Sequence, residues 1–176
     1  MTEETFVRTE RLAIRRFRGE DAPLLAAYRG DPEVARYQGW SPPSEAEARA
    51  FVEEMRAGEP GVRGQWFQFA LGLLPDEGLI GDVGLKLRGE EPATADIGYT
   101  LAAAHQGRGL ASEAVRAVIA MCFERFGVER VVATIDARNA ASLALARRLE
   151  MTEVEVVETI WRGEPCAERV FVVRRP

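Results

Sequence analysis

The chain has 176 residues, of which 47% are hydrophobic, so it is long enough for one domain with its own core, and we expect a single domain over 1–176. Its net charge of −5 argues against a nucleic-acid-binding surface, and the absence of an apolar run long enough for a bilayer argues against a membrane span. The charged N-terminus lacks the apolar core of a signal peptide, which favours a cytoplasmic protein, and Cys122 and Cys166 form no CxxC pattern, so we expect no metal site.

The first sixty residues alternate between extended and helical patterns. Residues 6–17 alternate apolar and polar side chains, which predicts a strand or a bent pair of strands. Residues 19–30 open with acidic residues and close with a glycine, as a short helix does. The segment 31–43 contains three prolines and predicts a loop with room for one helical turn. A helix over 44–58 follows, with a capping box at its start and a glycine at its end.

The rest of the chain predicts strands with one parallel crossover. Two strands, 65–74 and 78–89, are joined by Pro-Asp-Glu-Gly, a sequence typical of a hairpin turn. The pattern then predicts a strand over 95–103, a helix ending near Phe126, a strand over 130–137, a helix over 139–150 capped by Asn139, and a closing hairpin over 154–174 that turns at Gly163 to Pro165. This order indicates a mixed α/β (α+β) fold, with a mostly antiparallel sheet of about seven strands and about four flanking helices.

Residues 105–114, HQGRGLASEA, carry the strongest local signal. Gly107 and Gly109 let backbone N–H groups turn inward as an anion-binding nest, Arg108 adds positive charge, and the helix that follows adds the positive end of its dipole. No G-x-x-x-x-G-K-[ST] string exists, so the segment is not a P-loop, and Ser112 stands where the dinucleotide-binding fingerprint requires a glycine. Taken alone, these ten residues could also be a glycine-rich helix start that binds no ligand, which is the alternative to a phosphate-binding loop.

The surrounding residues favour a ligand. Gln106-x-x-Gly109-x-Ala111 resembles the pyrophosphate signature [QR]-x-x-G-x-[GA] of the GNAT (GCN5-related) N-acetyltransferases. DIGYTLAAAHQGRGLASEA (96–114) is similar to the EIGY.L....WGKGYATEA run of the RimJ/RimL-like branch, which acetylates protein N-termini. ARNAASLALARRLEM (137–151) resembles that branch's N..S......LGF segment, and 8–48 resembles its opening strand, helix and loop. The resemblance covers nearly the whole chain, and it implies a GNAT domain whose fourth and fifth strands splay apart.

This resemblance implies acetyl-CoA as the cofactor, held where those two strands splay. The backbone of the strand 95–103 would hydrogen-bond the pantetheine, and an N–H in the same stretch would polarise the thioester carbonyl. The pyrophosphate would lie on the loop 106–112. The implied cofactor-binding residues are Tyr99, Thr100, Leu101, Gln106, Gly107, Arg108, Gly109, Leu110, Ala111, Ser112, Asn139 and Ser142.

In this family an amine attacks the thioester carbon directly and releases a thiolate. Many relatives protonate the thiolate with a tyrosine, but Ala146 stands at that position, so the resemblance assigns the role to Ser142. A helix serine bonded back to a carbonyl is the alternative for Ser142. Tyr99 is the expected catalytic position on the strand, and Asp96 is the candidate base. Glu113 is expected to complement the helix dipole.

The acceptor amine sets how much help the enzyme must give. An α-amino group with a pKa near 8 is roughly 10% neutral at pH 7, whereas a lysine is only ~0.04% neutral. An N-terminal acceptor therefore suits a sequence without an obvious strong base. In the branch, the loop 31–43 and the strand after it line the acceptor pocket, so the substrate-binding candidates are Arg36, Tyr37, Trp40 and Trp66. Packing in the core or a plain surface position is the alternative for each of them.

One residue departs from the family pattern. The family's LGF is LEM here, with Glu150 where a glycine usually stands. If the turn is left-handed, as that glycine generally allows, the glutamate costs roughly 1 kcal/mol. The fold prediction does not depend on it.

Three functions follow from these residues. The first is acetylation of a protein or peptide α-amine, and the second is the same reaction on a small amine such as a polyamine, an amino acid or an aminoglycoside. The third is a non-catalytic acyl-CoA-binding module. The negative net charge suits a cationic acceptor in either of the first two cases. Family members of this size often dimerise, so a homodimer is a further expectation.

Overall fold

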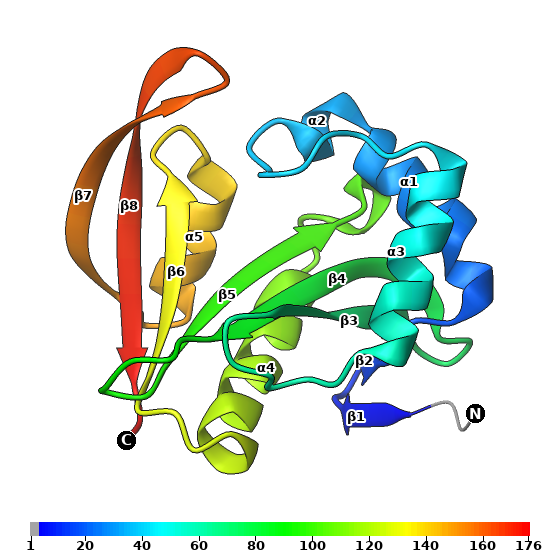
Figure 1. Ribbon diagram of the computed structural model, residues 1–176, viewed down its shortest axis with the longest axis horizontal. Helices are drawn as coiled ribbons and strands as arrows, with labels where there is room; N and C mark the ends of the chain where they lie inside the picture. Colours follow the sequence, from blue (N-terminus) through cyan, green and yellow to red (C-terminus); the bar gives the residue numbers. More distant parts are fainter. Residues whose placement is uncertain (1–3) are drawn as a thin grey trace.

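A single mixed sheet organises the computed structural model, which describes residues 4–176 (Figure 1). The strand order is β1-β2-β3-β4-β5-β6-β8-β7. Every neighbouring pair is antiparallel except β5 and β6, which are parallel. The strands are β1 (Thr5–Arg8), β2 (Leu12–Arg15), β3 (Trp66–Leu73), β4 (Gly78–Leu87), β5 (Thr94–Leu101), β6 (Arg130–Asp136), β7 (Thr152–Trp161) and β8 (Glu164–Arg174).

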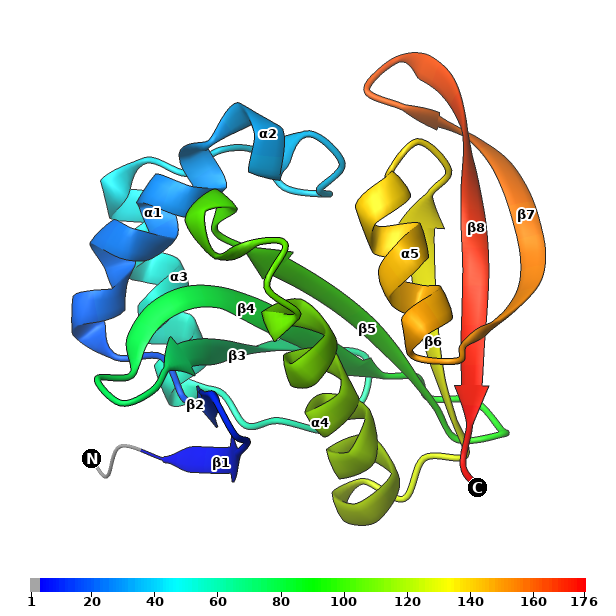
Figure 2. The same cartoon turned by 180° about the vertical axis from the view of Figure 1, so that it is seen from behind.

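Helices cover both faces of the sheet. Helices α1 and α3 pack together on one face, whereas α4 crosses the opposite face and α5 lies beside β6 on the same side as α4 (Figures 1 and 2). No helix among residues 4–176 is long and apolar enough to cross a membrane. The helices are α1 (Ala22–Gly30), α2 (Pro32–Ala35), α3 (Glu45–Ala57), α4 (Leu110–Arg125) and α5 (Ala140–Arg148), with short 3-10 turns η1 (Gly19–Asp21) and η2 (Ala103–His105).

The predicted fold class is confirmed, and two element counts change. Residues 6–17 form two strands, β1 and β2, so the sheet has eight strands rather than about seven, and α2 raises the number of helices to five. The strands expected to splay as the fourth and fifth are therefore β5 and β6. The last turn was predicted at Gly163 to Pro165, but Glu164 and Pro165 already pair within the hairpin. Trp161 pairs with Glu164, so Arg162 and Gly163 make the turn and both have positive φ (50° and 83°), as a two-residue hairpin requires.

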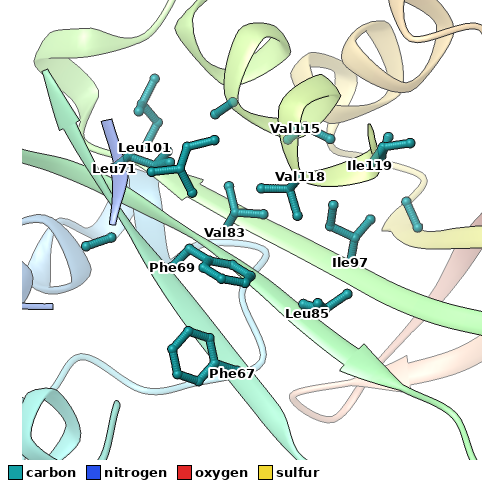
Figure 3. Packing of buried hydrophobic residues seen from close by; sticks show 14 of the residues in the cluster. Phe67, Phe69, Leu71, Val83, Leu85, Ile97, Leu101, Val115, Val118 and Ile119 are labelled. Carbon is teal, nitrogen blue, oxygen red and sulfur yellow. The ribbon is translucent and has the colours of Figure 1, made fainter. Parts of the chain in front are cut away.

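The strand sequences place apolar side chains against α4. Alternate residues of β3, β4 and β5 point to the same face, and the register aligns Phe69 with Val83 and Val83 with Tyr99. Figure 3 shows this face packed against Val115 and Val118 of α4. Burial of this face fixes the β5 register, and that register turns the Tyr99 side chain toward the side of α4 and α5.

Local signals set the ends of the helices. At α3, the Ser44 hydroxyl accepts a hydrogen bond from the Glu47 N–H at 3.3 Å, while the Glu47 carboxylate accepts one from the Ser44 N–H at 2.8 Å. This is the predicted capping box. At α5, the Asn139 side chain accepts a hydrogen bond from the Ser142 N–H at 3.1 Å, as the predicted cap does.

The C-terminus of α5 carries the one departure from the family pattern. Glu150 adopts φ +58°, its N–H donates to the Arg147 carbonyl, and the Met151 N–H donates to the Ala146 carbonyl. This is a Schellman motif, which places the residue after the helix in the left-handed region. The exposed glutamate therefore occupies a conformation that favours glycine.

Replacing Glu150 with glycine is expected to raise the free energy of unfolding by about 0.5–1 kcal/mol. Relief of the left-handed strain, about 1–2 kcal/mol, exceeds the added entropy of the unfolded glycine. Urea unfolding measures the change. Glu150→Ala removes the same charge but keeps the strain, and it should bring no gain; an equal gain in both variants would show that the charge, not the backbone, carries the effect.

Candidate active site

Strands β5 and β6 separate after a short parallel contact. Only Thr94 to Asp96 of β5 pair with β6, and they pair with Arg130 to Val132. Beyond that point β5 continues beside β4 as far as Leu101, while β6 continues beside β8 as far as Asp136. The two strands diverge toward α2 and the start of α5 (Figures 1 and 2). The edge of β5 that faces β6 is therefore open over its last residues.

Alternation along β5 shows which backbone groups face this opening. The Thr94 carbonyl accepts from the Arg88 N–H, and the Ala102 N–H donates to the Ile80 carbonyl, so even-numbered residues point their backbone groups toward β4. Tyr99 and Leu101 consequently point theirs toward β6. The Tyr99 carbonyl accepts from the Gln38 side chain at 3.4 Å and the Leu101 carbonyl from the Gln106 side chain at 2.8 Å. Their N–H groups face the same opening.

A cavity of about 530 Å³ occupies this opening. It reaches from α2 on one side, past the end of β5, to the first turn of α4, with α5 as its far wall. All of the residues predicted to bind the cofactor line it except Arg108. The lining residues are Glu33, Val34, Tyr37, Gln38, Tyr99, Thr100, Leu101, Gln106, Gly107, Gly109, Leu110, Ala111, Ser112, Asn139, Ala141, Ser142, Leu145 and Arg148.

The loop before α4 has the geometry of an anion site. Gly107 and Gly109 have φ values of +72° and +76°, and Gly109 is the residue immediately before the helix. A Cβ on Gly107 would meet nothing within 4 Å, so the glycine is required by its conformation and not by lack of space. Left-handed residues at a helix N-terminus aim successive N–H groups at one point, which suits a phosphate.

The Tyr99 side chain reaches the backbone of α5 at Ser142. The Tyr99 hydroxyl crosses from β5 and donates to the Ser142 carbonyl at 3.4 Å. Burial raises the pKa of the Tyr99 phenol, and the contact with Ser142 and the charge of Arg148 oppose part of that rise. The Tyr99 phenol therefore stays protonated at neutral pH.

Arg148 is a cavity residue that the sequence prediction missed. Its Nε lies 3.4 Å from the Ser112 hydroxyl, in the first turn of α4. Ser142, Leu145 and Arg148 are spaced by three residues, so they lie on one side of α5. Because Ser142 was already a predicted site residue, this helical spacing could have identified Arg148 from the sequence. The Arg148 guanidinium places a positive charge opposite the glycine nest.

The other end of the cavity is formed by α2 and the residues after it. Tyr37, predicted to bind substrate, lines the cavity here. The guanidinium of Arg138, from the β6–α5 connection, lies 5.9 Å from its ring. Glu33 and Gln38 also line this end and were not predicted. This is the side from which an acceptor can approach.

Three other predicted substrate residues lie outside the cavity. Arg36 is an exposed residue that pairs with Glu33 at 3.8 Å. Trp40 packs against the core, with the Arg29 guanidinium 4.9 Å from its ring. Trp66 is 45% exposed at the far end of β3, beside Lys86. Arg36 and Trp66 thus occupy surface positions and Trp40 a packing position, as the alternative to substrate binding expected.

Asp96 and Arg108 also lie outside the cavity. Asp96 belongs to the part of β5 that is still paired with β6, and its carboxylate binds Arg88 at 3.0 Å and Lys86 at 3.6 Å. We therefore assign Asp96 to an ion pair and not to amine deprotonation. The backbone carbonyl of Arg108 accepts a hydrogen bond from Arg11 at 2.9 Å.

Comparison with known proteins agrees with this geometry. The family described as Acetyltransferase (GNAT) domain matches residues 11–152. The uncharacterized N-acetyltransferase p20 of Bacillus licheniformis is 32% identical over 142 residues, which cover 80% of this chain and 79% of that protein. Among solved structures, a Vibrio cholerae protein described as a candidate ribosomal-protein-serine acetyltransferase superposes with a TM-score of 0.81 at 26% identity, covering 99% of this chain and 100% of that one. Mycobacterium smegmatis RimJ in complex with CoA-disulfide superposes with a TM-score of 0.80 at 18% identity, covering 93% and 81%.

Proposed function

The chain belongs to the GNAT acetyltransferase family and is an acetyl-CoA-dependent N-acetyltransferase, and from this premise we propose that its acceptor is a protein or peptide α-amine, as in the RimJ/RimL-like branch. The similarity to the Vibrio cholerae protein supports a protein acceptor. A small-molecule amine is the alternative that the experiments below distinguish.

The lack of a strong base in the described cavity supports an α-amine acceptor. Within residues 4–176, Glu33 is the one carboxylate that lines the cavity, and its side chain is 80% exposed. An exposed carboxylate beside water is a weak base. A peptide α-amine has a pKa near 8 and is already roughly 10% neutral at pH 7, so it can react without a strong base. A lysine, with a neutral fraction of ~0.04%, would need roughly 3 kcal/mol more help than the cavity offers.

The residues present fit acetyl-CoA, which when bound supplies the acetyl thioester. The N–H groups of Tyr99 and Leu101 on the open edge of β5 would donate to the pantetheine as those of a neighbouring strand would, while their carbonyls already accept from Gln38 and Gln106. The nest at Gly107 and Gly109 would hold the pyrophosphate, and Arg148 would add charge from the opposite wall.

The same residues account for the chemistry. An N–H of β5 near Tyr99 would serve as a fixed donor to the thioester carbonyl, and fixed donors are the main way enzymes stabilise a developing oxyanion. The Ser142 hydroxyl, which lines the cavity, would donate to the departing sulfur, and the Tyr99 phenol would hold the backbone of α5 at that residue. The acceptor would enter past Tyr37 and Gln38, and its proton would leave through water toward Glu33.

Replacing Ser142 with alanine is expected to lower kcat by about tenfold and leave the Kd for acetyl-CoA near the wild-type value. The factor is below the usual range for a proton donor because a thiol with a pKa near 8.5 leaves readily as the thiolate. Stopped-flow detection of free thiol measures kcat, and calorimetry measures Kd. Ser44→Ala, at a helix cap outside the cavity, is the matched control. An unchanged kcat would remove Ser142 from the chemistry.

A matched peptide pair tests the acceptor. One peptide carries a free α-amine and no lysine, and the other has a blocked N-terminus and one lysine. We expect measurable acetylation of the first, with a rate that rises between pH 6 and 8 as its α-amine loses its proton. Preference for the blocked lysine peptide would contradict the proposal.

A further inference from the structure

Three residues from two distant segments of the chain meet beside the glycine nest. Thr9 and Arg11 lie in the β1–β2 connection, and Glu113 lies in the first turn of α4. The Glu113 carboxylate accepts from the Thr9 hydroxyl at 2.6 Å, the Arg11 backbone N–H at 2.9 Å and the Arg11 Nε at 2.7 Å. We name this set, Thr9, Arg11 and Glu113, the clamp.

The clamp also reaches the loop itself. The Arg11 Nη1 donates to the Arg108 carbonyl at 2.9 Å. The peptide between residues 108 and 109 is trans, so its carbonyl and its N–H point in opposite directions. With the carbonyl held by Arg11, the Gly109 N–H points away from Arg11, toward the cavity that Gly109 lines.

We propose that Arg11 is a positioning residue for the pyrophosphate of acetyl-CoA, because its guanidinium fixes the orientation of the 108–109 peptide and thereby aims the Gly109 N–H into the cavity. The inference rests on the proposed assignment of the glycine nest to the pyrophosphate. Glu113 is then more than a partner of the helix dipole, since it holds the guanidinium in place. The other end of the loop is fixed separately, by the Gln106 side chain on the Leu101 carbonyl.

The chemistry of the clamp suits this role. Desolvation raises the pKa of Glu113, but hydrogen bonds from Thr9 and Arg11 outweigh it and keep the carboxyl ionised at neutral pH. A guanidinium presents several donors in a rigid fork, so one side chain can bind Glu113 and the Arg108 carbonyl together. A lysine in the same place has a single nitrogen on a flexible stem and cannot reproduce that arrangement.

The test compares an acetyl donor that carries the pyrophosphate with one that does not. S-acetylpantetheine carries the same thioester and pantetheine as acetyl-CoA but lacks the pyrophosphate and the 3′-phosphoadenosine attached to it. We expect Arg11→Ala to raise the Kd and the KM for acetyl-CoA by about tenfold, with kcat close to wild type, and Arg11→Lys to recover only part of the loss. With S-acetylpantetheine, both variants should match the wild type.

A matched control comes from the same hairpin. Arg8 is an exposed arginine of β1 that pairs with Glu77 and does not contact the loop, so Arg8→Ala should leave the constants for both donors unchanged. The donor comparison also separates positioning from general damage. A variant that loses activity equally with both donors is structurally impaired, and that result would overturn the inference.

Calorimetric Kd values keep this inference distinct from the proposed acceptor, because binding of acetyl-CoA needs no amine. If Gly109→Val weakens acetyl-CoA binding and Arg11→Ala does not, the nest assignment stands and the clamp inference is wrong. If neither variant changes the Kd, both are wrong. Weaker binding in both variants, limited to the donor that carries the pyrophosphate, is the result that we expect.

Discussion

Replacing Gly109 with valine is expected to raise the Kd for acetyl-CoA by tenfold or more. Gly109 has φ +76°, stands immediately before α4 and lines the cavity. A β-branched residue avoids the left-handed region at a cost of about 1–2 kcal/mol, so the free loop would relax into another conformation that binding must reverse. About 1.4 kcal/mol corresponds to a tenfold change in Kd. The added Cβ would also lie 3.5 Å from the Arg11 Nη2, so the valine would press on the side chain that holds the loop.

A second left-handed glycine supplies the control. Gly127, in the connection between α4 and β6, has φ +63° and open space around its Cβ position, and it does not line the cavity. Gly127→Val should cost similar stability without changing the Kd. Calorimetric titration with acetyl-CoA measures both variants. Equal Kd values for Gly109→Val and wild type would mean that the loop does not hold the pyrophosphate.

Replacing Asp82 with alanine is expected to lower the free energy of unfolding by about 3–5 kcal/mol, the usual cost of leaving one partner of a buried ion pair alone. Asp82 lies on β4 and is only 3% exposed; it accepts hydrogen bonds from the Tyr28 hydroxyl and from Arg29 at 3.1 Å. Burial and the charge of Asp82 raise the pKa of Tyr28, so the phenol stays protonated and donates to the carboxylate. Without Asp82, the Arg29 charge remains buried, with only the Trp40 and Phe51 rings over it.

Urea unfolding measures this loss. Glu53→Ala removes an acidic residue that pairs with Arg56 on the exposed side of α3, where the Glu53 side chain is 55% exposed. That variant should cost less than 1 kcal/mol, since exposed pairs contribute little. A loss as small for Asp82→Ala would show that the buried cluster does not stabilise the fold.

Local patterns in the sequence were sufficient to predict most of the fold and the glycine loop of the site. The capping box at Ser44, the cap at Asn139 and the glycine loop before α4 act over a few residues, so their sequences identify them directly. The strand alternation in β3, β4 and β5 also predicts which side chains pack against α4. The family resemblance added the splay, which no local pattern encodes.

What could not be predicted depends on register and on contacts between distant segments. Asp96 and Tyr99 are three residues apart on β5, yet the strand leaves β6 between them, so one lies in the paired part and the other in the cavity. Arg11 meets the loop across 97 residues of sequence, and Arg148 meets Ser112 across 36. Trp66 resembles a pocket aromatic by sequence position, but the β3 register places it at the far end of the strand.

An unbiased acceptor screen tests the central claim most directly. The protein would be incubated with isotopically labelled acetyl-CoA and a pool that mixes peptides with free N-termini, N-terminally blocked lysine peptides, polyamines, amino acids and aminoglycosides, and the products would be identified by mass spectrometry. We predict label on the α-amines of peptides, because the described cavity offers only the exposed carboxylate of Glu33 as a base. Label confined to the small amines would contradict the proposal and make Tyr37 and Gln38 the residues that select a small acceptor.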